Sequence, residues 1–281
     1  MTNPISYHEK IKNERHVFLY CVVGRSSSTA FQRLINSSNK VWLWGEPRGI
    51  INQAILLINQ MKKVNSDDNV KLSLSRMYHS YNDNKHLEFY ANAIGNLDSS
   101  IEMVSSAISN ILKPWAPGVK RFGFKDIDPV SSQTLGYLKE IYPQSIFMFC
   151  FRDPLTQWSS ICKLDWPMSK TRDVKAFLDR YHLMASMFLQ YAEKNDINAF
   201  VENNDLRNEA RVNLIMKYLN IPKIDSSLIN VTVGSLAGDK LTPIEKETIL
   251  KSEAYKDYKE MRKISSAFYE DQKKDLVQPL A

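Results

Sequence analysis

The stretch from Tyr20 to Leu34, YCVVGRSSSTAFQRL, predicts a strand, a tight turn and a helix in direct succession. Its first residues complete an apolar, β-branched and aromatic run from His16, which is typical of a buried parallel strand. After Gly24 and four consecutive hydroxyl side chains, apolar residues recur at helical spacing. A strand joined directly to a helix is the repeating unit of α/β proteins, so this stretch predicts that fold class.

Strand and helix patterns also alternate along the rest of the chain. Further strands are expected at 41–44, 121–124, 145–151 and 197–201, and further helices at 131–141, 173–194, 209–219 and 244–273. This alternation predicts a parallel β-sheet flanked by helices, with right-handed crossovers. We expect a single domain over residues 1–281, with a helical insertion or lid at about 70–115 and a C-terminal helical extension at 240–281.

The net charge narrows the class of ligand. The 281 residues include 37 Lys and Arg against 31 Asp and Glu, which gives a formal net charge of +6. The basic residues are interspersed and never form a run of five. This modest excess suits a small polyanionic ligand better than nucleic acid, although an ordinary soluble surface would carry the same charge. We therefore expect no nucleic-acid partner.

The few cysteines and the lack of long apolar runs indicate the cellular compartment of the protein. Cys21, Cys150 and Cys162 are an odd number and too few for a disulfide framework, and the first two lie in apolar runs where burial is expected. The first 16 residues lack the apolar stretch of a signal peptide, and no apolar run approaches the roughly 20 residues of a membrane helix. We expect a soluble, cytoplasmic protein with no membrane partner. The sequence carries no signal for an oligomeric state.

The turn after the first expected strand has the composition of an anion-binding loop. Free backbone N–H groups meet at Gly24 and at the start of the following helix, and the helix dipole adds positive character there. An ordinary serine N-cap is the alternative, but it would need only one hydroxyl. The loop lacks the Gly-Lys pair of a Walker A motif, and nothing in it predicts a metal. The side chains expected at the anion are Arg25, Ser26, Ser27, Ser28 and Thr29.

A second cluster occurs in FCFRDPLTQWSS. The expected strand at 145–151 delivers Arg152 at its carboxyl end, and Ser160 follows eight residues later on a helix that begins near Pro154. Open α/β sheets bind ligands beyond the carboxyl ends of their strands, so Arg152 and Ser160 could converge on a second phosphate. A structural ion pair of Arg152 beside a helix N-cap is the alternative.

Together these stretches resemble the sulfotransferase family that uses 3′-phosphoadenosine-5′-phosphosulfate (PAPS), and most closely its bacterial and tyrosylprotein branches. GRSSSTAFQRL resembles the loop for the 5′-phosphosulfate, FRDPLTQWSS resembles the 3′-phosphate element, and AFVENNDLRNEARVNLIMKYLNIP is similar to a later family segment. The resemblance runs from about His16 to Pro222. It implies a P-loop-NTPase-like sulfotransferase fold, PAPS as cosubstrate, adenosine 3′,5′-bisphosphate as product, and no metal.

The resemblance also implies catalytic residues. Glu46 in LWGEPRG matches the general base of the related branches, and Lys125 in FKDID matches the lysine that faces the sulfuryl bridge. Arg25 would serve the 5′-phosphate. The alternative for Glu46 is a carboxylate that favours a helix N-terminus, and for Lys125 a surface lysine paired with Asp126 or Asp128.

The sequence departs from the family pattern at several positions. Ser27 stands where the family has glycine, and Asn203 and Asn204 replace tyrosine and glutamate. Contacts to adenine therefore do not carry over to 202–206. Lys240 is a candidate for the basic loop that closes over the nucleotide.

The expected acceptor is a hydroxyl or amine of a small molecule, such as a natural product. Trp44, Arg48 and Trp115 are candidates to contact it, although the tryptophans could equally be core or rim aromatics and Arg48 could pair with a neighbouring carboxylate. Two other functions fit parts of the sequence. One is a P-loop nucleotide kinase with a degenerate loop, and the other is a non-catalytic nucleotide-binding protein of the same fold.

Overall fold

The computed structural model describes residues 4–47, 49–66, 97–164, 167–195, 199–222, 224 and 240–277. The chain forms two compact units, one from residues 1–12 and 49–113 and the other from residues 13–48 and 114–281. No helix in these described ranges is long and apolar enough to cross a membrane.

The first unit contains the helices α1 (Pro4–Ile11), α3 (Ile50–Ser66) and α5 (Leu97–Ile111). Both α1 and α3 pack against α5, and His8 Nδ1 of α1 lies 2.8 Å from Ser109 Oγ of α5. The buried residues of α3 recur at helical spacing, at Ile51, Ile55 and Ile58. Helix α5 falls within the expected insertion at 70–115, whereas residues 67–96 lie outside the described ranges. The role of a lid stays a prediction.

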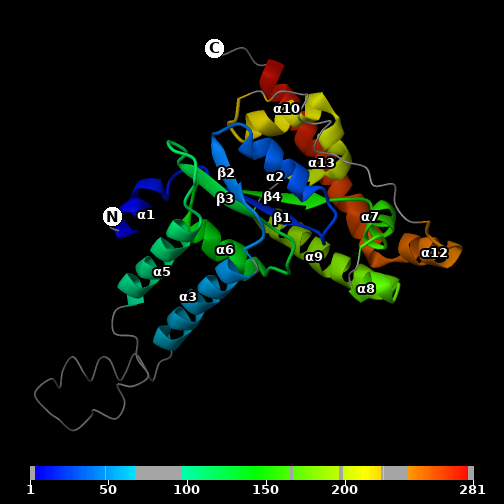
Figure 1. Ribbon diagram of the computed structural model, residues 1–281, viewed down its shortest axis with the longest axis horizontal. Helices are drawn as coiled ribbons and strands as arrows, with labels where there is room; N and C mark the ends of the chain where they lie inside the picture. Colours follow the sequence, from blue (N-terminus) through cyan, green and yellow to red (C-terminus); the bar gives the residue numbers. More distant parts are fainter. Residues whose placement is uncertain are drawn as a thin grey trace, which may run out of the picture. The chain divides into compact units, whose positions relative to one another are not determined.

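The second unit is built on five parallel strands, as the alternating pattern predicted (Figure 1). They are β1 (Val17–Cys21), β2 (Val41–Trp44), β3 (Arg121–Asp126), β4 (Ile146–Phe151) and β5 (Phe200–Glu202). Their order in the sheet is β2-β3-β1-β4-β5, and every neighbouring pair is parallel. The prediction of an α/β fold with a parallel sheet flanked by helices is confirmed.

Alternating strand residues bury the two faces of this sheet against different helices. Helices α2 (Ser28–Asn36) and α10 (Glu209–Tyr218) lie on one side, and α6 (Ser132–Ile141) and α9 (Val174–Asn195) on the other (Figure 1). The α2 face is mainly aliphatic and contains both strand cysteines, Cys21 and Cys150, which are buried as expected. The α9 face is aromatic, with Phe149 stacked on Phe188 at a centroid distance of 4.4 Å.

Close packing of β3 against β1 explains why position 123 is a glycine. Gly123 in β3 is the register partner of Val17 in β1. A Cβ atom at position 123 would lie 1.6 Å from the carbonyl oxygen of Val17 and 2.9 Å from Leu43 Cδ2. Any side chain there would therefore force β1 and β3 apart.

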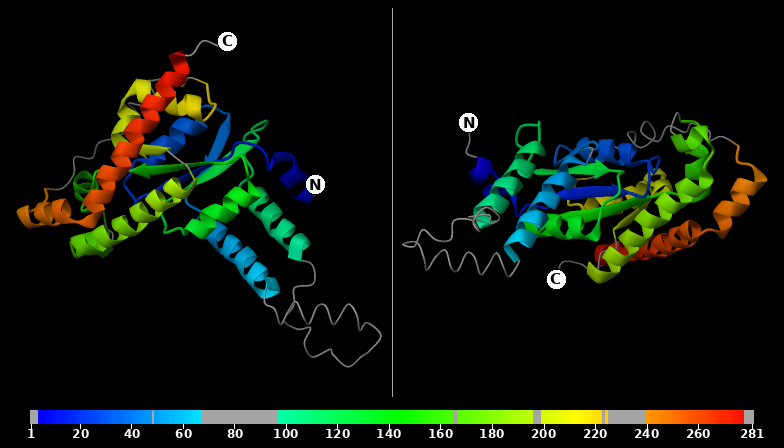
Figure 2. Two further views of the ribbon diagram at one scale, coloured as in Figure 1. Left: turned by 180° about the vertical axis from the view of Figure 1, so that it is seen from behind. Right: turned by 90° about the horizontal axis from the view of Figure 1, so that it is seen from below.

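The expectation of one continuous helix at 244–273 is wrong. The structure has two helices, α12 (Pro243–Lys251) and α13 (Glu253–Val277), because Ser252 between them is extended, with φ −78° and ψ 157°. Its Oγ accepts a hydrogen bond from Tyr255 N at 3.2 Å, so Ser252 caps the start of α13. Helix α13 packs along α9 and against β5 (Figure 2).

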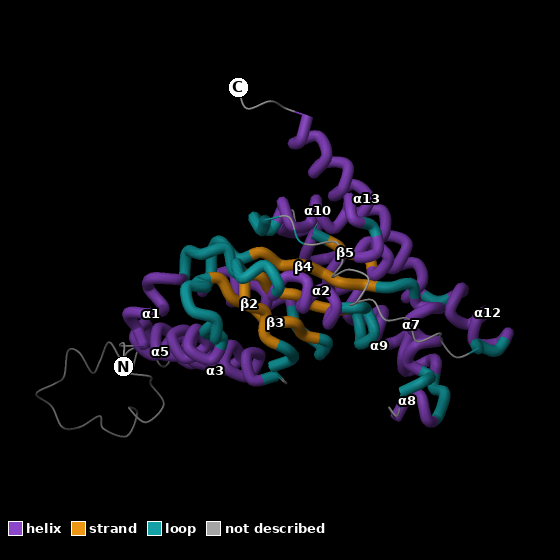
Figure 3. Tube along the Cα trace, turned by 45° about the horizontal axis from the view of Figure 1, so that its top comes forward, coloured by secondary structure: helices purple, strands orange, loops and turns teal. Residues whose placement is uncertain are grey.

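Because all five strands are parallel, their carboxyl ends lie at one edge of the sheet. The loop after β1 leads to α2, and the loop after β4 leads to α7 (Pro154–Ile161), which lies beyond the end of β4 (Figure 3). The short helix α8 (Pro167–Lys170) follows α7, and the 3₁₀ segment η2 (Asn203–Arg207) follows β5. This edge therefore collects the segments in which the sequence placed its candidate functional residues.

Candidate active site

The loop between β1 and α2 has a backbone that is shaped to bind an anion. Val23, Arg25 and Ser27 have positive φ angles of 60°, 69° and 65°, whereas Gly24 and Ser26 between them do not. Alternation of this kind directs successive backbone N–H groups into one concavity, a nest for an anion. Ser27 also precedes α2 without capping it by its side chain. The alternative of an ordinary serine N-cap is therefore wrong.

A buried glutamine that the sequence reading missed holds the start of this loop. Gln157 of α7 has no exposed surface, and its Nε2 donates to the carbonyl oxygens of Val22 at 2.8 Å, Val23 at 3.3 Å and Gly24 at 2.7 Å. A β-branched residue with positive φ, such as Val23, is strained and needs such support. The available signal was a polar residue on the buried face of α7, one turn before Ser160.

The two predicted phosphate elements lie side by side. Arg25 Nε donates to Ser160 Oγ at 3.1 Å, although the two residues are 135 positions apart. Arg152 donates from Nη1 to the carbonyl oxygen of Arg25 at 3.3 Å and from Nε to Thr156 Oγ1 at 3.1 Å. The carboxyl ends of β1 and β4 therefore present one continuous surface with two guanidinium groups.

The carboxylate next to Arg152 in the sequence belongs to a helix cap. Asp153 caps α7 by accepting hydrogen bonds from the N–H groups of Leu155 and Thr156. In the described part of the chain Arg152 itself makes no ion pair. Burial, with the charges of Arg25 and Arg207, lowers its pKa, and the charge of Asp153 opposes this shift only in part. A bound anion would relieve this repulsion. The alternative of a structural ion pair at Arg152 is not what the structure shows.

Lys125 and Glu46 meet at the carboxyl ends of β3 and β2. Lys125 is only 6% exposed, and its Nζ lies 2.5 Å from Glu46 Oε1 and 3.3 Å from Thr29 Oγ1. The alternative of a surface lysine paired with Asp126 or Asp128 is therefore wrong. Because Glu46 forms an ion pair with Lys125, it does not serve merely as a carboxylate that favours a helix N-terminus.

Asp126 and Asp128 have other partners. Asp126 Oδ1 accepts hydrogen bonds from the N–H groups of Ile127 at 2.8 Å and Asp128 at 3.1 Å, and Asp128 lies 3.5 Å from Arg180. Burial raises the pKa of Asp126 to about 6, helped by the charges of Asp128 and Glu46 and opposed by the two N–H groups. Asp126 is thus a buried carboxyl directly beside Lys125.

Asn203, one of the departures from the family pattern, reaches the anion loop. Its Nδ2 donates a hydrogen bond to Ser27 Oγ. Asn204, by contrast, is exposed. The segment η2 therefore contacts the anion loop as well, in addition to β1 and α7.

The structure gives fewer contacts for the remaining predicted site residues, which are Trp44, Trp115, Lys240 and Arg48. Trp44 and Trp115 contact each other edge to face, with centroids 6.3 Å apart and an interplanar angle of 82°, and Trp115 is 82% exposed. Lys240 is exposed, and its carbonyl oxygen accepts from Arg172 Nη2 at 3.4 Å. Arg48 lies outside the described residues.

A cavity of about 230 Å³ adjoins the anion loop. It is lined by loop residues, by the two residues after β3, by α8 and by α9, namely Val23, Gly24, Ile127, Asp128, Pro167, Met168 and Arg180. Its walls combine apolar side chains with one ion pair, which is the usual composition of a small-molecule site.

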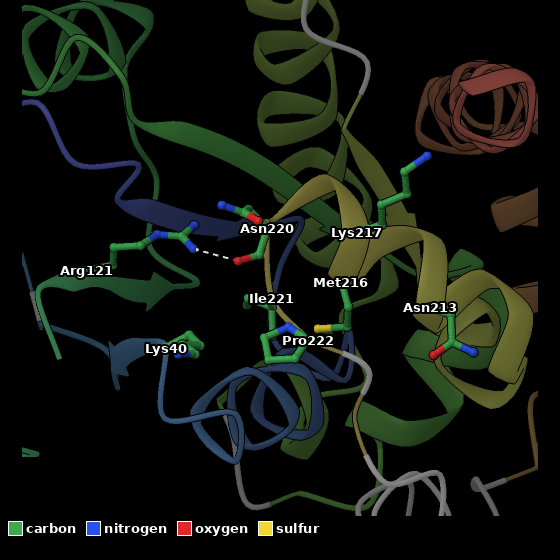
Figure 4. Close-up of a pocket in the computed structure, with 8 residues that line it drawn as sticks. All are labelled: Lys40, Arg121, Asn213, Met216, Lys217, Asn220, Ile221 and Pro222. Carbon is green, nitrogen blue, oxygen red and sulfur yellow. Dashed lines mark hydrogen bonds between the residues drawn. The ribbon is translucent and has the colours of Figure 1, made fainter. Parts of the chain in front are cut away.

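A larger cavity of about 700 Å³ lies at the opposite edge of the sheet (Figure 4). Arg121, the first residue of β3, lines it, but its guanidinium donates to the carbonyl oxygens of Arg15, Leu219 and Asn220. Lys217 points away from Arg121 in Figure 4, so these cations do not converge on one ligand. Arg121 thus ties α10 to the sheet.

The described residues contain no group of three or more His, Cys, Asp or Glu side chains that could hold a metal ion. The carboxyl edge carries the backbone N–H donors of the anion loop and the cationic side chains of Arg25, Lys125 and Arg152. Such a set can bind phosphate or sulfate oxygens by hydrogen bonds and charge.

Comparison with known families identifies this arrangement. A sequence model of the Sulfotransferase family matches residues 21–204, from the last residue of β1 into η2. The matched span contains the anion loop, Glu46, Lys125, Arg152 and Ser160, whereas Lys240 lies beyond it. A comparison with curated proteins gives no match. Because the family match covers more than half of the 281 residues and coincides with the parallel sheet and its anion loop, the chain belongs to the sulfotransferase family.

Proposed function

We propose that this protein transfers the sulfuryl group of PAPS to a hydroxyl or amine of a small-molecule acceptor. The observation that carries the proposal is the hydrogen bond from Arg25 to Ser160, because it joins the two elements that resemble the two phosphate sites of one nucleotide. A bisphosphorylated adenosine could span adjacent sites of this kind. An isolated anion loop would not explain the second arginine.

The loop and α7 would hold the two ends of the nucleotide. The N–H groups of the nest and the Arg25 side chain would bind the 5′-phosphosulfate, and Ser26 to Thr29 would add hydroxyl donors. Arg152, with Ser160, would bind the 3′-phosphate. Burial, with the charges of Arg25 and Arg207, lowers the pKa of Arg152, so a bound phosphate would stabilise the charged guanidinium.

Lys125 and Glu46 would act on the reacting atoms. Sulfuryl transfer resembles phosphoryl transfer, an in-line displacement with a loose transition state, so the protein mainly positions groups and balances charge. Lys125 would donate to the oxygen between phosphate and sulfur, where negative charge develops. Glu46 would accept the acceptor's proton. Its Oε1 is bound to Lys125, so Oε2 is the atom for this task.

The acceptor would be a small molecule, for example a natural product in the cytoplasm. The 230 Å³ cavity beside Val23 and Gly24 supports a small acceptor, because it adjoins the anion loop and its walls combine apolar side chains with one ion pair. Trp44, the last residue of β2, lies two residues before Glu46 and forms an aromatic surface with Trp115. Lys240 and Arg48 remain candidates for nucleotide closure and acceptor contact.

The test is transfer of labelled sulfate from PAPS to a panel of small phenols, alcohols and amines. We expect labelled product that persists in EDTA. Phosphoryl transfer from ATP that requires magnesium would favour the kinase alternative. Tight binding of adenosine 3′,5′-bisphosphate with no sulfated product from any acceptor would favour a non-catalytic protein.

A further inference from the structure

We propose that Asn203 is a positioning residue that holds Ser27 in the left-handed conformation which the anion loop requires. This inference rests on the proposed function in one respect: the anion in the loop is taken to be the 5′-phosphosulfate of PAPS. Its evidence is the contact between η2 and the loop.

Ser27 needs outside support to keep its conformation. Its φ of 65° is in the left-handed region, which is unfavourable for any residue with a Cβ atom. The side chain does not compensate by capping α2. Instead Ser27 Oγ accepts a hydrogen bond from Asn203 Nδ2. This bond ties the strained residue to η2, the segment that directly follows β5.

Asn203 is well placed to act as an anchor. It is 4% exposed and directly follows β5, whose last residue, Glu202, is the register partner of Phe151 in β4. Asn203 therefore lies level with Arg152 at the carboxyl edge. The amide of Asn203 thus approaches the loop from the side opposite to β3, where Lys125 lies.

The C-terminal helix makes this anchor rigid. The backbone N–H of Glu202 donates to Asp205 Oδ2 at 2.8 Å, which closes the turn around Asn203. From α13, Tyr258 donates to Glu202 Oε1 and Tyr269 donates to Asp205 Oδ2, each at 2.9 Å. Arg211 of α10 also pairs with Asp205. Three side chains from α13 and α10 therefore fix the segment that carries Asn203.

The geometry also relates two departures from the family pattern. Ser27 stands where the family has glycine, which adopts positive φ without a steric penalty. Asn203 stands where the family has tyrosine. Because the two side chains bond to each other, we infer that the asparagine compensates for the serine.

This inference predicts a specific non-additivity. In the Ser27 background, Asn203→Ala should weaken binding of adenosine 3′,5′-bisphosphate about tenfold, because the loop loses its support. In a Ser27→Gly background the same substitution should change binding by less than about twofold, since glycine needs no support. The affinities are measured by titration calorimetry on the full chain.

Two controls make the result specific. Asn204→Ala changes the same residue type at the next, exposed position and should leave affinity unchanged. Asn203→Leu keeps the branching and the number of non-hydrogen side-chain atoms but removes the donor, and it serves if the alanine variant does not fold. If Asn203→Ala and Asn203→Leu weaken binding equally in both backgrounds at position 27, Asn203 acts on the ligand directly and the inference is wrong.

Inorganic sulfate, as a second probe, separates this inference from the proposed function. A wild-type protein that binds sulfate but not the nucleotide would overturn the PAPS assignment, while the sulfate affinities of the same variants would still decide the role of Asn203. A wild-type protein that binds neither probe would overturn both proposals.

Discussion

Lys125 Nζ lies 2.5 Å from Glu46 Oε1, and the pair joins two residues that are 79 positions apart in the sequence. The lysine is nearly buried, whereas the carboxylate side chain is 37% exposed. A buried ammonium with one partially open partner is suited to charge balance on one side and proton transfer on the other. The two residues expected to touch the reacting atoms therefore form one unit.

The first prediction concerns this unit. Glu46→Gln should lower kcat by about 10²- to 10⁴-fold, because the amide cannot accept the acceptor's proton. The Kd of adenosine 3′,5′-bisphosphate should stay the same or fall, since Lys125 loses a competing negative charge. Single-turnover sulfate transfer and calorimetry measure the two effects. Glu260→Gln, an exposed glutamate of α13, is the control, and a Glu46→Gln enzyme of full speed would remove the base from Glu46.

The second prediction concerns the 3′-phosphate. Arg152→Ala should raise the Kd of adenosine 3′,5′-bisphosphate about 10- to 100-fold, the usual effect of losing a charged hydrogen bond. The Kd of adenosine 5′-monophosphate, which lacks the 3′-phosphate, should change little. Arg33→Ala, at an exposed arginine of α2, should affect neither nucleotide. If Arg152→Ala still discriminated between the two nucleotides as well as wild type, the arginine would not contact the 3′-phosphate.

The third prediction concerns the support of the loop by Gln157. Gln157→Leu keeps the side-chain volume but leaves three buried carbonyl oxygens without their donor. We expect the free energy of unfolding to fall by about 2–4 kcal/mol, measured by urea denaturation. Gln133→Leu, at an exposed glutamine of α6, should cost far less. Equal losses in the two variants would show that the carbonyl contacts of Gln157 contribute nothing.

The fourth prediction concerns pH and Asp126. The folded protein raises the pKa of Asp126 to about 6, above its ordinary value of roughly 4, so the folded state binds this proton more tightly than the unfolded chain. The resulting stabilisation is complete below about pH 4 and is lost as pH rises through about 6. Asp126→Asn removes this titration. The variant should therefore gain stability relative to wild type as pH rises from 4 to 7, by about 2–3 kcal/mol.

Urea unfolding of both proteins across this pH range measures the difference directly. Asp179→Asn, at an exposed position of α9, should show a difference that does not vary with pH in this way. If the difference in free energy of unfolding between Asp126→Asn and wild type did not change with pH, the carboxyl would titrate alike in the folded and unfolded states.

Local patterns were enough to predict most of the elements. The strand, loop and helix at 16–34 needed only apolar periodicity and a turn, and the same logic placed β2, β4, α6, α7 and α9. The break at Ser252 was missed because the charged pattern is helical on both sides of it. Its signal was a serine followed by glutamate, a common helix start.

The contacts within the candidate site could not be read in the same way. Gln157 looked like any residue of an amphipathic helix, and Asn203 looked like the loss of a family contact. Their partners, Gly24 and Ser27, are 133 and 176 positions away in the chain. No local period or motif encodes such distances.

The sequence by itself determined the order of strands and helices and the positions of the hydroxyl-rich loop and of the arginine and serine predicted to form the second phosphate element, because these depend on patterns within a few turns of the chain. Only the tertiary structure decided that β1 lies between β3 and β4, and hence that Arg25 meets Ser160, Lys125 meets Glu46 and Asn203 meets Ser27. Strand order is set by the packing of two helical layers on the whole sheet, and this packing is a long-range property that no short stretch contains.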